Sequence, residues 1–486
     1  CRDGLERAVN EAKSSFGDDR VFVEKYIGEP RHIEIQIIAD KHGNTVYMGE
    51  RECSIQRRHQ KVLEEAPSPF LDEAMRQAMG KQAVALAKAV DYYSAGTVEF
   101  IVDDKKNFFF LEMNTRLQVE HPVTELITGQ DLVELMIKVA ANEELPFGQD
   151  DVKLNGWALE ARVYAEDPFR NFLPSIGRLV RYQSPQETHH VRVDTGVTEG
   201  GEISIYYDPM IAKLITFGAD RTEAIQHMRT ALDSYYIRGV NHNIGFLSAL
   251  IAHSRFQSGN ITTNFIDEEY PDGFHPQDLP AEDPIIQVIV AASIHHAYQQ
   301  RAASISGQVA GHGRQFDGTW VVVTKDGHHP VTVRRMTNGY SVIVDGTTHE
   351  FQTDWQPGEP LLRGNLADDE NLVFQVEREN IAYRLTHGGS QDDVLVLSPA
   401  HAELNALMPV KVPPDTSKLL LSPMPGLLIS LAVAEGQEVK AGEELAVIEA
   451  MKMENVLRAE RDAVVSSIKA TTGESLMVDQ VIMDFE

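Results

Sequence analysis

One amine in the sequence is placed where it could carry a covalently attached group. Lys452 lies between Met451 and Met453, at what the pattern predicts to be the tip of a short hairpin. A lysine at an exposed turn usually serves solubility, and two flexible thioethers can pack back onto the protein beneath it. The alternative is a lysine that a rigid unit presents for modification, and the surrounding residues favour this second interpretation.

The region around this lysine, residues 419–486, contains a weak internal repeat. Gly436 and Gly473 are 37 residues apart, and apolar positions around them repeat at the same offset. The apolar pairs are Leu431 with Ile468, Val439 with Leu476 and Leu445 with Ile482. Such a repeat predicts two similar β-halves related by pseudo-twofold symmetry, with the lysine between them.

A second group of polar residues lies in the stretch FLEMNTRLQVEHPVTE. Glu112, Asn114 and Arg116 alternate with other residues, so a strand would project all three onto one face. Gln118 and Glu120 occupy the next two positions of the same alternation. An edge strand with a solvated face is the alternative interpretation, but asparagine is a poor strand residue, which favours a functional role for this face.

The strand predicted just before this stretch, SAGTVEFIVD, would turn back through DKKN and bring Glu99 close to Glu112. Two carboxylates and the Asn114 amide would then converge. Oxygen ligands of this kind suit Mg²⁺, which usually also bridges substrate phosphates. The arrangement therefore predicts a metal site that serves phosphoryl transfer.

Two segments nearer the start of the chain supply further polar side chains. These are Gln56, His59 and Lys61 in ERECSIQRRHQKVLEEAP, and Glu24, Lys25 and His32 in VFVEKYIGEPRHIEIQ. The run from Arg57 to Lys61 fits a solvated charged loop equally well, so these residues do not define a site by themselves.

Composition bounds the functions that the chain can have. Its 486 residues, 42% of them hydrophobic, suffice for large cores and predict about three domains. The net charge of −29, from 44 basic and 73 acidic residues, argues against a nucleic-acid partner. Two cysteines, Cys1 and Cys53, predict a reducing compartment without a disulfide framework. No apolar run approaches the roughly 20 residues that a membrane-spanning helix needs.

The first predicted domain covers residues 1–274. Strand patterns such as RVFVEKYI and HIEIQIIAD alternate there with helical stretches, the longest from Asp72 to Val90, which predicts an α/β or α+β unit. A Pro- and Asp-rich segment, YPDGFHPQDLPAEDP, marks its end.

The second predicted domain, residues 275–402, is different in kind. Asp283 and Pro284 form a good N-cap and first turn for an apolar helix, and short strands with Asp-Gly or Asn-Gly turns follow it. This pattern predicts an antiparallel β-barrel around a central helix. A Pro-stiffened linker over residues 403–418 then leads to the all-β unit at residues 419–486.

The segment EAMKMENVL, preceded by SPMPG, resembles the biotinyl carrier domains, which have a lipoyl-like flattened barrel and carry biotin on the lysine of Ala-Met-Lys-Met. The tetrapeptide is complete from Ala450 to Met453. Lipoyl domains share the fold, but their lysine normally follows an acidic residue within Asp-Lys-Ala, which this sequence lacks. The resemblance implies biotin joined covalently to Lys452.

Residues 1–274, with the polar blocks above and YYDPMIAKLI, resemble the ATP-grasp core of biotin carboxylase. The resemblance implies a multidomain α+β protein with ATP, bicarbonate and Mg²⁺ or Mn²⁺ at a partial biotin carboxylase domain. It implies that ATP is bound by Glu24, Lys25, Ile27, His32, Gln56 and His59. It implies that the metal is held by Glu99, Glu112 and Asn114, and bicarbonate by Lys61, Arg116, Gln118 and the backbone of Val119.

Two further residues receive catalytic roles from this resemblance. Glu120 matches the general base that deprotonates bicarbonate, and Arg192, in HHVRVDTGV, matches the residue that steadies the biotin enolate. A carboxylate beside arginine and lysine stays ionised, and cations stabilise the charge that develops in phosphoryl transfer. The family implies carboxyphosphate as the first product, followed by release of CO₂ beside biotin.

The chain opens on Cys1 within a predicted helix, LERAVNEAKSSFG, and the Gly-rich lid and phosphate-binding lysines of the family do not occur in it. We therefore expect a missing N-terminal portion. We also expect that residues 1–486 do not turn over ATP by themselves.

The acyl acceptor is expected to bind another subunit, because no carboxyltransferase domain is evident; this excludes a single-chain pyruvate carboxylase. The helix plus barrel is similar to the subunit-bridging domain of biotin-dependent acyl-CoA carboxylase α subunits. Stretches such as DKHGNTVYMGERECSIQRRHQK look most like the propionyl-CoA carboxylase α family.

This resemblance implies an α6β6 hetero-oligomer whose carboxyltransferase β subunit binds the acyl-CoA, and a biotin protein ligase that modifies Lys452. It implies the bacterial cytoplasm, or the mitochondrial matrix in a eukaryote. Methylcrotonyl-CoA or another acyl-CoA is the alternative substrate. A catalytically silent biotin carrier and docking module is the alternative to an active enzyme.

Overall fold

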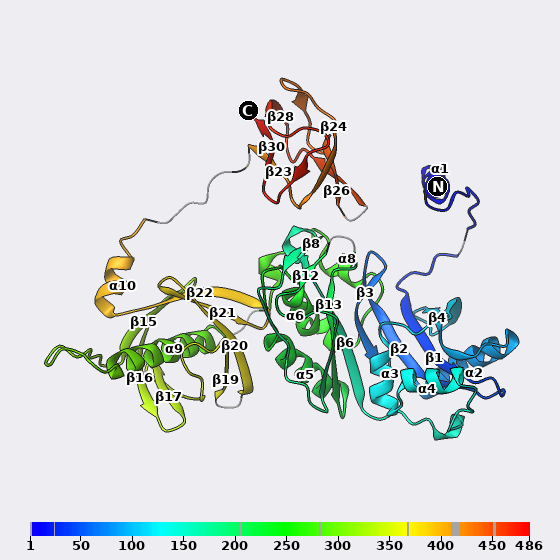
Figure 1. The fold of residues 1–486 in the computed structure, drawn as a ribbon, viewed down its shortest axis with the longest axis horizontal. Helices are drawn as coiled ribbons and strands as arrows, with labels where there is room; N and C mark the ends of the chain where they lie inside the picture. Colours follow the sequence, from blue (N-terminus) through cyan, green and yellow to red (C-terminus); the bar gives the residue numbers. More distant parts are fainter. Residues whose placement is uncertain are drawn as a thin grey trace.

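The computed structural model describes residues 2–23, 25–204, 207–280, 283–366, 369–409, 416, 418–450 and 453–486. Figure 1 shows three bodies in chain order: a sheet with helices (blue to green), a barrel around a long helix (green to yellow) and a small β body (orange to red). This arrangement agrees with the predicted multidomain α+β architecture.

The first body is organised by one eight-stranded sheet with the strand order β11-β13-β6-β3-β2-β1-β4-β5. All neighbouring strands in it run antiparallel. The strands are β1 (Arg31–Ala39), β2 (Thr45–Arg57), β3 (Gln60–Ala66), β4 (Ser94–Val102), β5 (Phe108–Asn114), β6 (Trp157–Tyr164), β11 (Val191–Thr195) and β13 (Met210–Gly218).

Helices and short strands complete this body. The helices are α1 (Arg2–Phe16), α2 (Glu73–Ala89), α3 (His121–Thr128), α4 (Leu132–Ala140), α5 (Arg221–Asp233), α6 (Ile244–Ala252), α7 (Ser254–Gln257) and α8 (Phe265–Glu269). The short strands are β7 (Glu166–Asp167), β8 (Leu173–Pro174), β9 (Gly177–Arg178), β10 (Arg181–Gln183), β12 (Glu202–Ile203) and β14 (Tyr236–Arg238). Single 3₁₀ turns lie at Gln149–Asp151, Pro168–Arg170 and Pro276–Asp278.

The two faces of β1 separate an apolar core from a polar layer. Isoleucines 33, 35 and 37 pack with Met75 and Met79 of α2, and all are buried. His32, Glu34 and Gln36 occupy the opposite face and are also buried, because successive side chains of a strand point to opposite sides. Helix α2 has the predicted bounds, since the Asp72 side chain caps its N-terminus by accepting from the Met75 amide.

One predicted strand is wrong. Residues 20–23 and 25–27, within RVFVEKYI, have no regular secondary structure. Phe22, Val23 and Tyr26 are 83%, 90% and 83% exposed. Alternating apolar residues stabilise a strand only when a neighbouring strand pairs with it and a core covers one face; among the described residues this segment has neither.

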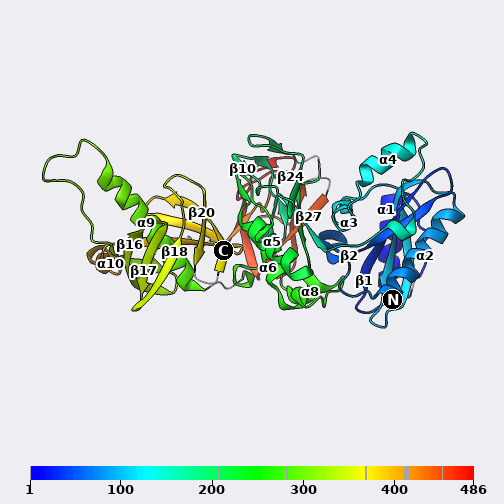
Figure 2. The same cartoon turned by 90° about the horizontal axis from the view of Figure 1, so that it is seen from below.

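The second body is the predicted barrel around a helix. Strands β15 to β22 form one closed barrel, and α9 (Pro284–Ser304) lies among them in both views (Figures 1 and 2). Val288, Ile289 and Ile294 of α9 are fully buried in its core. The strands are β15 (Thr319–Thr324), β16 (Gly327–Met336), β17 (Gly339–Val344), β18 (Thr347–Gln352), β19 (Leu361–Leu366), β20 (Asp369–Glu379), β21 (Ala382–His387) and β22 (Ser390–Leu397).

The barrel is fixed to the first body by a polar contact around Arg238 of β14. Its guanidinium donates to Glu377 at 2.8 and 2.9 Å and to Gln375 at 3.0 Å, both on β20. Gln375 in turn donates to the backbone carbonyls of Asp233 and Tyr235 at 3.1 Å. A short helix, α10 (Pro399–Asn405), follows the barrel and continues across the domain limit predicted at residue 402.

The third body confirms the predicted internal repeat. Its two four-stranded sheets have the orders β23-β30-β28-β25 and β27-β26-β24-β29. The strands are β23 (Leu419–Leu421), β24 (Gly426–Leu431), β25 (Glu438–Val439), β26 (Glu444–Ala450), β27 (Met453–Arg458), β28 (Ala463–Ile468), β29 (Ser475–Leu476) and β30 (Val481–Phe485). Strands β24 and β25 recur 37 residues later as β28 and β29, so each half of the repeat supplies equivalent strands.

No helix among the described residues is long and apolar enough to cross a membrane.

Candidate active site

A row of charged residues crosses four adjacent strands on the polar face of the large sheet. Arg51 of β2 is paired in register with Glu34 of β1, Glu34 with Glu99 of β4, and Glu99 with Glu112 of β5. The prediction that Glu99 and Glu112 lie side by side is therefore confirmed. Such a row needs compensating charges, because burying an unpaired carboxylate is costly.

Arg51 supplies the central compensation. Its side chain is fully buried and donates five hydrogen bonds. The acceptors are Glu34 (2.5 Å), Gln36 (2.6 Å), Thr124 (2.9 Å), Thr97 (3.1 Å) and Gln118 (2.7 Å). The guanidinium thereby ties β1, β4, α3 and the segment before α3 to β2, and each of its five donors is used.

Lys61 of β3 provides the second cation. Its Nζ donates to Glu34 at 2.6 Å and to Glu120 at 2.5 Å, and it lies 3.5 Å from Glu99. Burial alone would lower the pKa of Lys61, but the surrounding carboxylates Glu34, Glu120 and Glu99 raise it. The amine is consequently held in its charged form.

Two of the carboxylates facing these cations are strongly acidic. Burial alone would raise the pKa of Glu34, but Arg51 and Lys61 lower it to about 2. Burial likewise opposes ionisation of Glu99, but the hydrogen bond from His32 and the charge of Lys61 bring its pKa to about 2. Both side chains are therefore anionic at neutral pH.

Glu120 lies between two cations at the start of α3, where it is the N-cap residue. Its carboxylate accepts from Lys61 and, at 3.0 Å, from Arg162 of β6, and it is 2% exposed. Arg162 also donates to Glu64 at 2.6 Å. Burial opposes the charge of Arg162, but Glu64 and Glu120 raise its pKa.

The predicted metal ligands form a compact oxygen-rich group. The Asn114 amide donates to Glu99 at 2.8 Å and to Glu112 at 3.3 Å, which brings all three side chains together. Glu99 is buried whereas Glu112 is exposed, so a cation held between them would be open to solvent on one side. Two carboxylates and an amide oxygen match the ligand preference of Mg²⁺ and Mn²⁺.

The residues predicted for bicarbonate are only partly assembled. Gln118 is buried and bridges Arg51 and Glu99, donating to the latter at 2.7 Å. The Val119 carbonyl accepts from Lys213 of β13 at 2.9 Å. Arg116 lies beyond the end of β5 and is exposed, and the one hydrogen bond recorded for its side chain goes to the Leu117 carbonyl. The prediction that Arg116 shares a strand face with Glu112 and Asn114 is wrong, because the strand ends at Asn114.

Arg192 lies on the edge strand β11 and does not contact Glu120 among the described residues. Its guanidinium forms a bidentate pair with Asp194 at 2.8 and 3.0 Å and donates to Glu125 of α3 at 2.8 Å. Glu125 belongs to the helix that Glu120 begins, so Arg192 is linked to that helix. The arginine that contacts Glu120 is Arg162, and the role predicted for Arg192 beside the biotin enolate stays a prediction.

The predicted nucleotide residues fall into two groups. His32 lies 2.9 Å from Glu99, and its Nδ1 accepts from Gln56 at 2.9 Å, so both adjoin the polar layer. His59 lies in the turn between β2 and β3 with a positive φ of 66°. The remaining positions are Lys25 and Ile27, which precede β1, and Glu24, which lies outside the described residues.

Lys452 also lies outside the described residues, together with Met451. Its immediate neighbours Ala450 and Met453 are paired in register between β26 and β27. The structure therefore confirms the predicted hairpin on both sides of the lysine, at the junction between the two halves of the repeat.

Sequence reasoning missed Arg51, Glu34 and Arg162. Each lies inside a strand, where Glu34 and Arg162 have apolar residues directly on either side and Arg51 lies between Glu50 and Glu52. A charge within such a run is itself a signal, because buried charges in a strand must find partners on adjacent strands.

Four family models match successive parts of the chain. They are the carbamoyl-phosphate synthase L chain ATP binding domain (residues 1–147), the biotin carboxylase C-terminal domain (160–268), the propionyl-coenzyme A carboxylase BT domain (288–411) and the biotin-requiring enzyme domain (418–485). The propionyl-CoA carboxylase alpha chain of Ruegeria pomeroyi is 55% identical over all of this chain and 74% of that protein. The chain belongs to the propionyl-CoA carboxylase alpha chain family. This confirms the resemblance on which the predicted enzyme class depends.

Other relatives agree with this family. The human mitochondrial propionyl-CoA carboxylase alpha chain is 49% identical over all of this chain and 67% of that protein. The mitochondrial methylcrotonoyl-CoA carboxylase subunit alpha of Dictyostelium discoideum is 39% identical over 97% of this chain and 69% of that protein. The alternative assignment to the methylcrotonyl-CoA family is therefore less well supported.

Solved structures match the first body. The biotin carboxylase domain of Hydrogenobacter thermophilus 2-oxoglutarate carboxylase, in complex with MgADP, ADP and bicarbonate, has a TM-score of 0.54 and 45% identity over 58% of this chain and 61% of that one. Campylobacter jejuni biotin carboxylase has a TM-score of 0.53 and 43% identity over 55% and 59% of the respective chains. These matches confirm the predicted biotin carboxylase fold.

The buried guanidinium of Arg51 yields a stability prediction. In Arg51→Met, Glu34 loses one of its two cations and four neutral acceptors lose their donor, so we expect the first body to lose about 3–5 kcal/mol. The calorimetric unfolding transition of that body should move to a clearly lower temperature. Lys440→Met is the control, because Lys440 pairs with Asp462 on the exposed surface and its loss should leave the unfolding temperature nearly unchanged. Equal effects of both substitutions would contradict this account.

The acidic carboxylates yield a pH prediction. Because the folded-state pKa of Glu34 and Glu99 is lowered to about 2, their stabilisation is complete above the unfolded value of about 4.3 and is lost as the pH falls toward 2. The melting temperature of the first body should therefore decrease over this interval. In Glu99→Gln the decrease should be smaller, since one contributing carboxylate is absent. An identical pH profile in the variant would show that Glu99 contributes nothing.

Proposed function

We propose that this protein catalyses the ATP- and bicarbonate-dependent carboxylation of biotin attached to Lys452, as the α subunit of a propionyl-CoA carboxylase. A separate carboxyltransferase β subunit would pass the carboxyl group to propionyl-CoA and form methylmalonyl-CoA. One observation supports the proposed carboxylation of biotin. The buried Glu120 carboxylate lies between Lys61 and Arg162. Beside it is the oxygen-rich group of Glu99, Glu112 and Asn114.

In this proposal Glu120 is the general base. An ionised carboxylate accepts protons and cannot donate one, and Glu120 is within hydrogen-bond distance of two cations that can also hold an anion. Bicarbonate bound at Lys61 and Arg162 would thus present its hydroxyl proton to the Glu120 carboxylate. We assign the anion-binding guanidinium to Arg162, because it donates to Glu120 at 3.0 Å, whereas the recorded partners of the Arg192 side chain are Asp194 and Glu125.

Charge stabilisation accounts for the remaining side chains. A bound Mg²⁺ or Mn²⁺ would neutralise phosphate charge during phosphoryl transfer, and Glu99, Glu112 and Asn114 are the residues that would hold it. Lys61, fixed between Glu34 and Glu120, keeps a positive charge where the bicarbonate oxygen becomes a nucleophile. Arg116 and Gln118 would complete the anion site, with Lys25, Ile27, His32, Gln56 and His59 around the nucleotide.

The rest of the chain would link this reaction to its partners. Biotin supplies a nucleophilic ring nitrogen when it is attached, and a biotin protein ligase would attach it to Lys452 at the β26–β27 hairpin. The helix and barrel, matched by the BT domain, would contact the β subunit in an α6β6 assembly. The relatives are bacterial and mitochondrial, which supports a bacterial cytoplasm or a mitochondrial matrix as the location.

The assignment of Glu120 predicts a selective loss of activity. In the full-length gene product supplied with free biotin, Glu120→Gln should reduce bicarbonate-dependent ATP turnover by at least about 100-fold, the lower range for a lost general base. Lys452→Ala is the matched control and should leave this turnover unchanged, because free biotin replaces the attached group. Residues 1–486 alone are predicted to be inactive. Full activity in Glu120→Gln would exclude the proposed base.

The assignment of Lys452 predicts a single attachment point. Protein made together with an active biotin ligase should be captured by streptavidin, and intact-mass analysis should show one added biotin. Lys452→Ala should abolish both signals, whereas Lys440→Ala, on the exposed surface of the same body, should abolish neither. Biotinylation without bicarbonate-dependent turnover in the full-length product would favour the silent carrier instead.

A further inference from the structure

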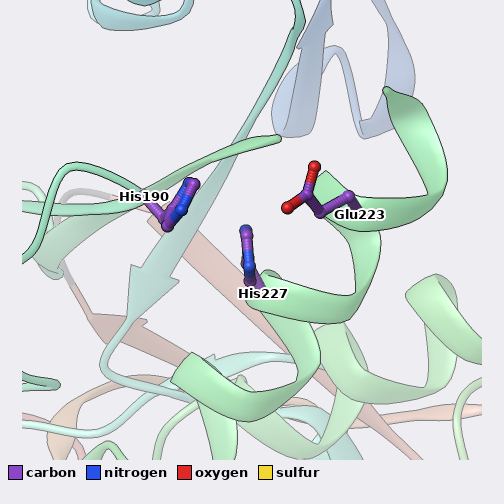
Figure 3. A group of neighbouring side chains, drawn as sticks. All are labelled: His190, Glu223 and His227. Atoms are coloured by element: carbon purple, nitrogen blue, oxygen red, sulfur yellow. The ribbon is translucent and has the colours of Figure 1, made fainter. Parts of the chain in front are cut away.

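We propose that His190, Glu223 and His227 form a binding site for a first-row divalent cation, with Zn²⁺ as the best-suited ion. One ligand atom from each side chain lies within 4.8 Å of the others. Figure 3 shows that the three side chains face a common space, one from the segment before β11 and two from α5. All three are partly exposed, so an ion can reach them from solvent.

The spacing along α5 explains why two of the ligands converge. Glu223 and His227 are four residues apart within the helix Arg221–Asp233, and residues at this spacing lie one above the other on the same face. His190 approaches this face from the edge of the sheet, and its ring centroid is 4.4 Å from that of His227. The site thus joins segments that are more than 30 residues apart in the sequence.

The hydrogen bonds of both imidazoles leave the correct nitrogen available. Nδ1 of His190 and Nδ1 of His227 lie 3.2 and 2.8 Å from the same acceptor, the Phe217 carbonyl oxygen. A carbonyl has no proton to give, so each Nδ1 must carry the hydrogen and donate it. In a neutral ring Nε2 then bears the free lone pair. Among the described residues neither Nε2 atom has a recorded hydrogen-bond partner.

This arrangement matches the surroundings of histidines that bind metal. Such histidines usually donate the second ring nitrogen to a carbonyl or carboxylate, which fixes the tautomer and the ring orientation. Here one backbone carbonyl orients two imidazoles at once. The shared carbonyl therefore supports a metal site independently of the proximity of the three side chains.

Glu223 retains a free oxygen for a ligand. Its Oε2 accepts from the Ala219 amide at 2.6 Å, and Asp220, the N-cap, accepts from the Glu223 amide at 2.9 Å. Glu223 thus accepts from the residue before the N-cap while its own amide donates to the N-cap side chain. These bonds orient the carboxylate by one oxygen, and no hydrogen bond to Oε1 is recorded among the described residues.

The donor set indicates the class of cation. Two imidazole nitrogens and one carboxylate oxygen are typical of Zn²⁺ and related transition metals, whereas Mg²⁺ and Ca²⁺ prefer oxygen ligands alone. Zn–N bonds of about 2.0–2.1 Å place tetrahedral ligand atoms about 3.3 Å apart. One possible ligand atom of each side chain lies within 4.8 Å of the others, and side-chain rotation would bring the ligand atoms to the bonding separation.

Two other groups of possible ligand residues in the first body already have other partners or roles. One group consists of His32, Glu34 and Glu99. The other consists of Glu34, Cys53 and Glu120. All residues of both groups are buried. Glu34 and Glu120 are paired with Arg51 and Lys61, and Glu99 belongs to the metal-binding group already proposed with Glu112 and Asn114. The His190 group contains no such internal cation.

Binding at this site would fasten the edge of the sheet. Strand β11 is the last strand of the eight-stranded sheet, and Arg192, two residues after His190, bonds Glu125 of α3. An ion shared with α5 would restrain the start of β11 and would stabilise the first body by mass action. The proposed role of Zn²⁺ is therefore structural and independent of the biotin-dependent reaction.

The test uses tag-free, metal-stripped residues 1–486 titrated with Zn²⁺ alone, followed by calorimetry and by the melting temperature. We expect one site with a dissociation constant of about 1 µM or lower and a Zn²⁺-dependent rise in melting temperature. His190→Asn and His227→Asn keep a donor near the Nδ1 position but remove Nε2, and Glu223→Gln keeps an acceptor for Ala219. Each should weaken binding at least about tenfold with little change in the metal-free melting temperature.

The matched control is His253→Ala. His253 is another half-buried imidazole of the first body, 3.1 Å from the Glu269 carboxylate, and its loss should leave Zn²⁺ binding unchanged. Absence of saturable binding to the unmodified protein would overturn the proposal. So would binding that persists in all three cluster variants, or that is lost equally in His253→Ala. If the cluster serves only to cap α5, the unmodified protein will show no Zn²⁺-dependent stabilisation.

Discussion

The polar layer of the first body depends on one fully buried guanidinium. Arg51 is fully buried, so its charge is compatible with folding only because five acceptors from β1, β4, α3 and the segment before α3 surround it. This requirement fixes the relative positions of those elements, because each acceptor must reach a rigid planar fork. The carboxylates Glu34 and Glu99 can then stay ionised inside the protein, and Lys61 is held between them and Glu120.

The sequence predicted the parts of this layer that depend on local pairing. Glu99 and Glu112 were expected side by side because a short turn joins their strands, and a hairpin leaves little freedom of register. Arg51 and Arg162 were not expected, because several of their partners come from elements far away in the chain: Thr124 is 73 residues from Arg51 and Glu120 is 42 residues from Arg162. Alternation along a strand shows which face a side chain occupies but cannot show which other strand lies beside it.

The same distinction explains the fold predictions. The repeat of 37 residues in the third body and the Asp-Gly and Asn-Gly turns of the barrel are local signals, and both were correct. RVFVEKYI has the alternation of a strand, but Phe22, Val23 and Tyr26 are exposed and unpaired with any described strand. Strand propensity describes how well a residue fits a half-buried sheet, so it has no effect where a sheet is not adjacent. The prediction for Arg116 failed for the related reason that β5 ends two residues earlier.

The position of Glu120 connects the arginine to the proposed chemistry. Glu120 is the N-cap of α3, and Thr124, one turn later, accepts from Arg51. Val123 and Ile127 of the same helix are fully or nearly fully buried against β6 and β13. Helix α3 therefore contacts the sheet both through apolar packing and through the hydrogen bond between Arg51 and Thr124. A helix N-terminus favours a carboxylate through its free amides and dipole, and Lys61 and Arg162 add two full charges. The buried carboxylate therefore faces two cations at the place proposed for proton transfer from bicarbonate, and Arg51 holds the helix that carries it without contacting Glu120.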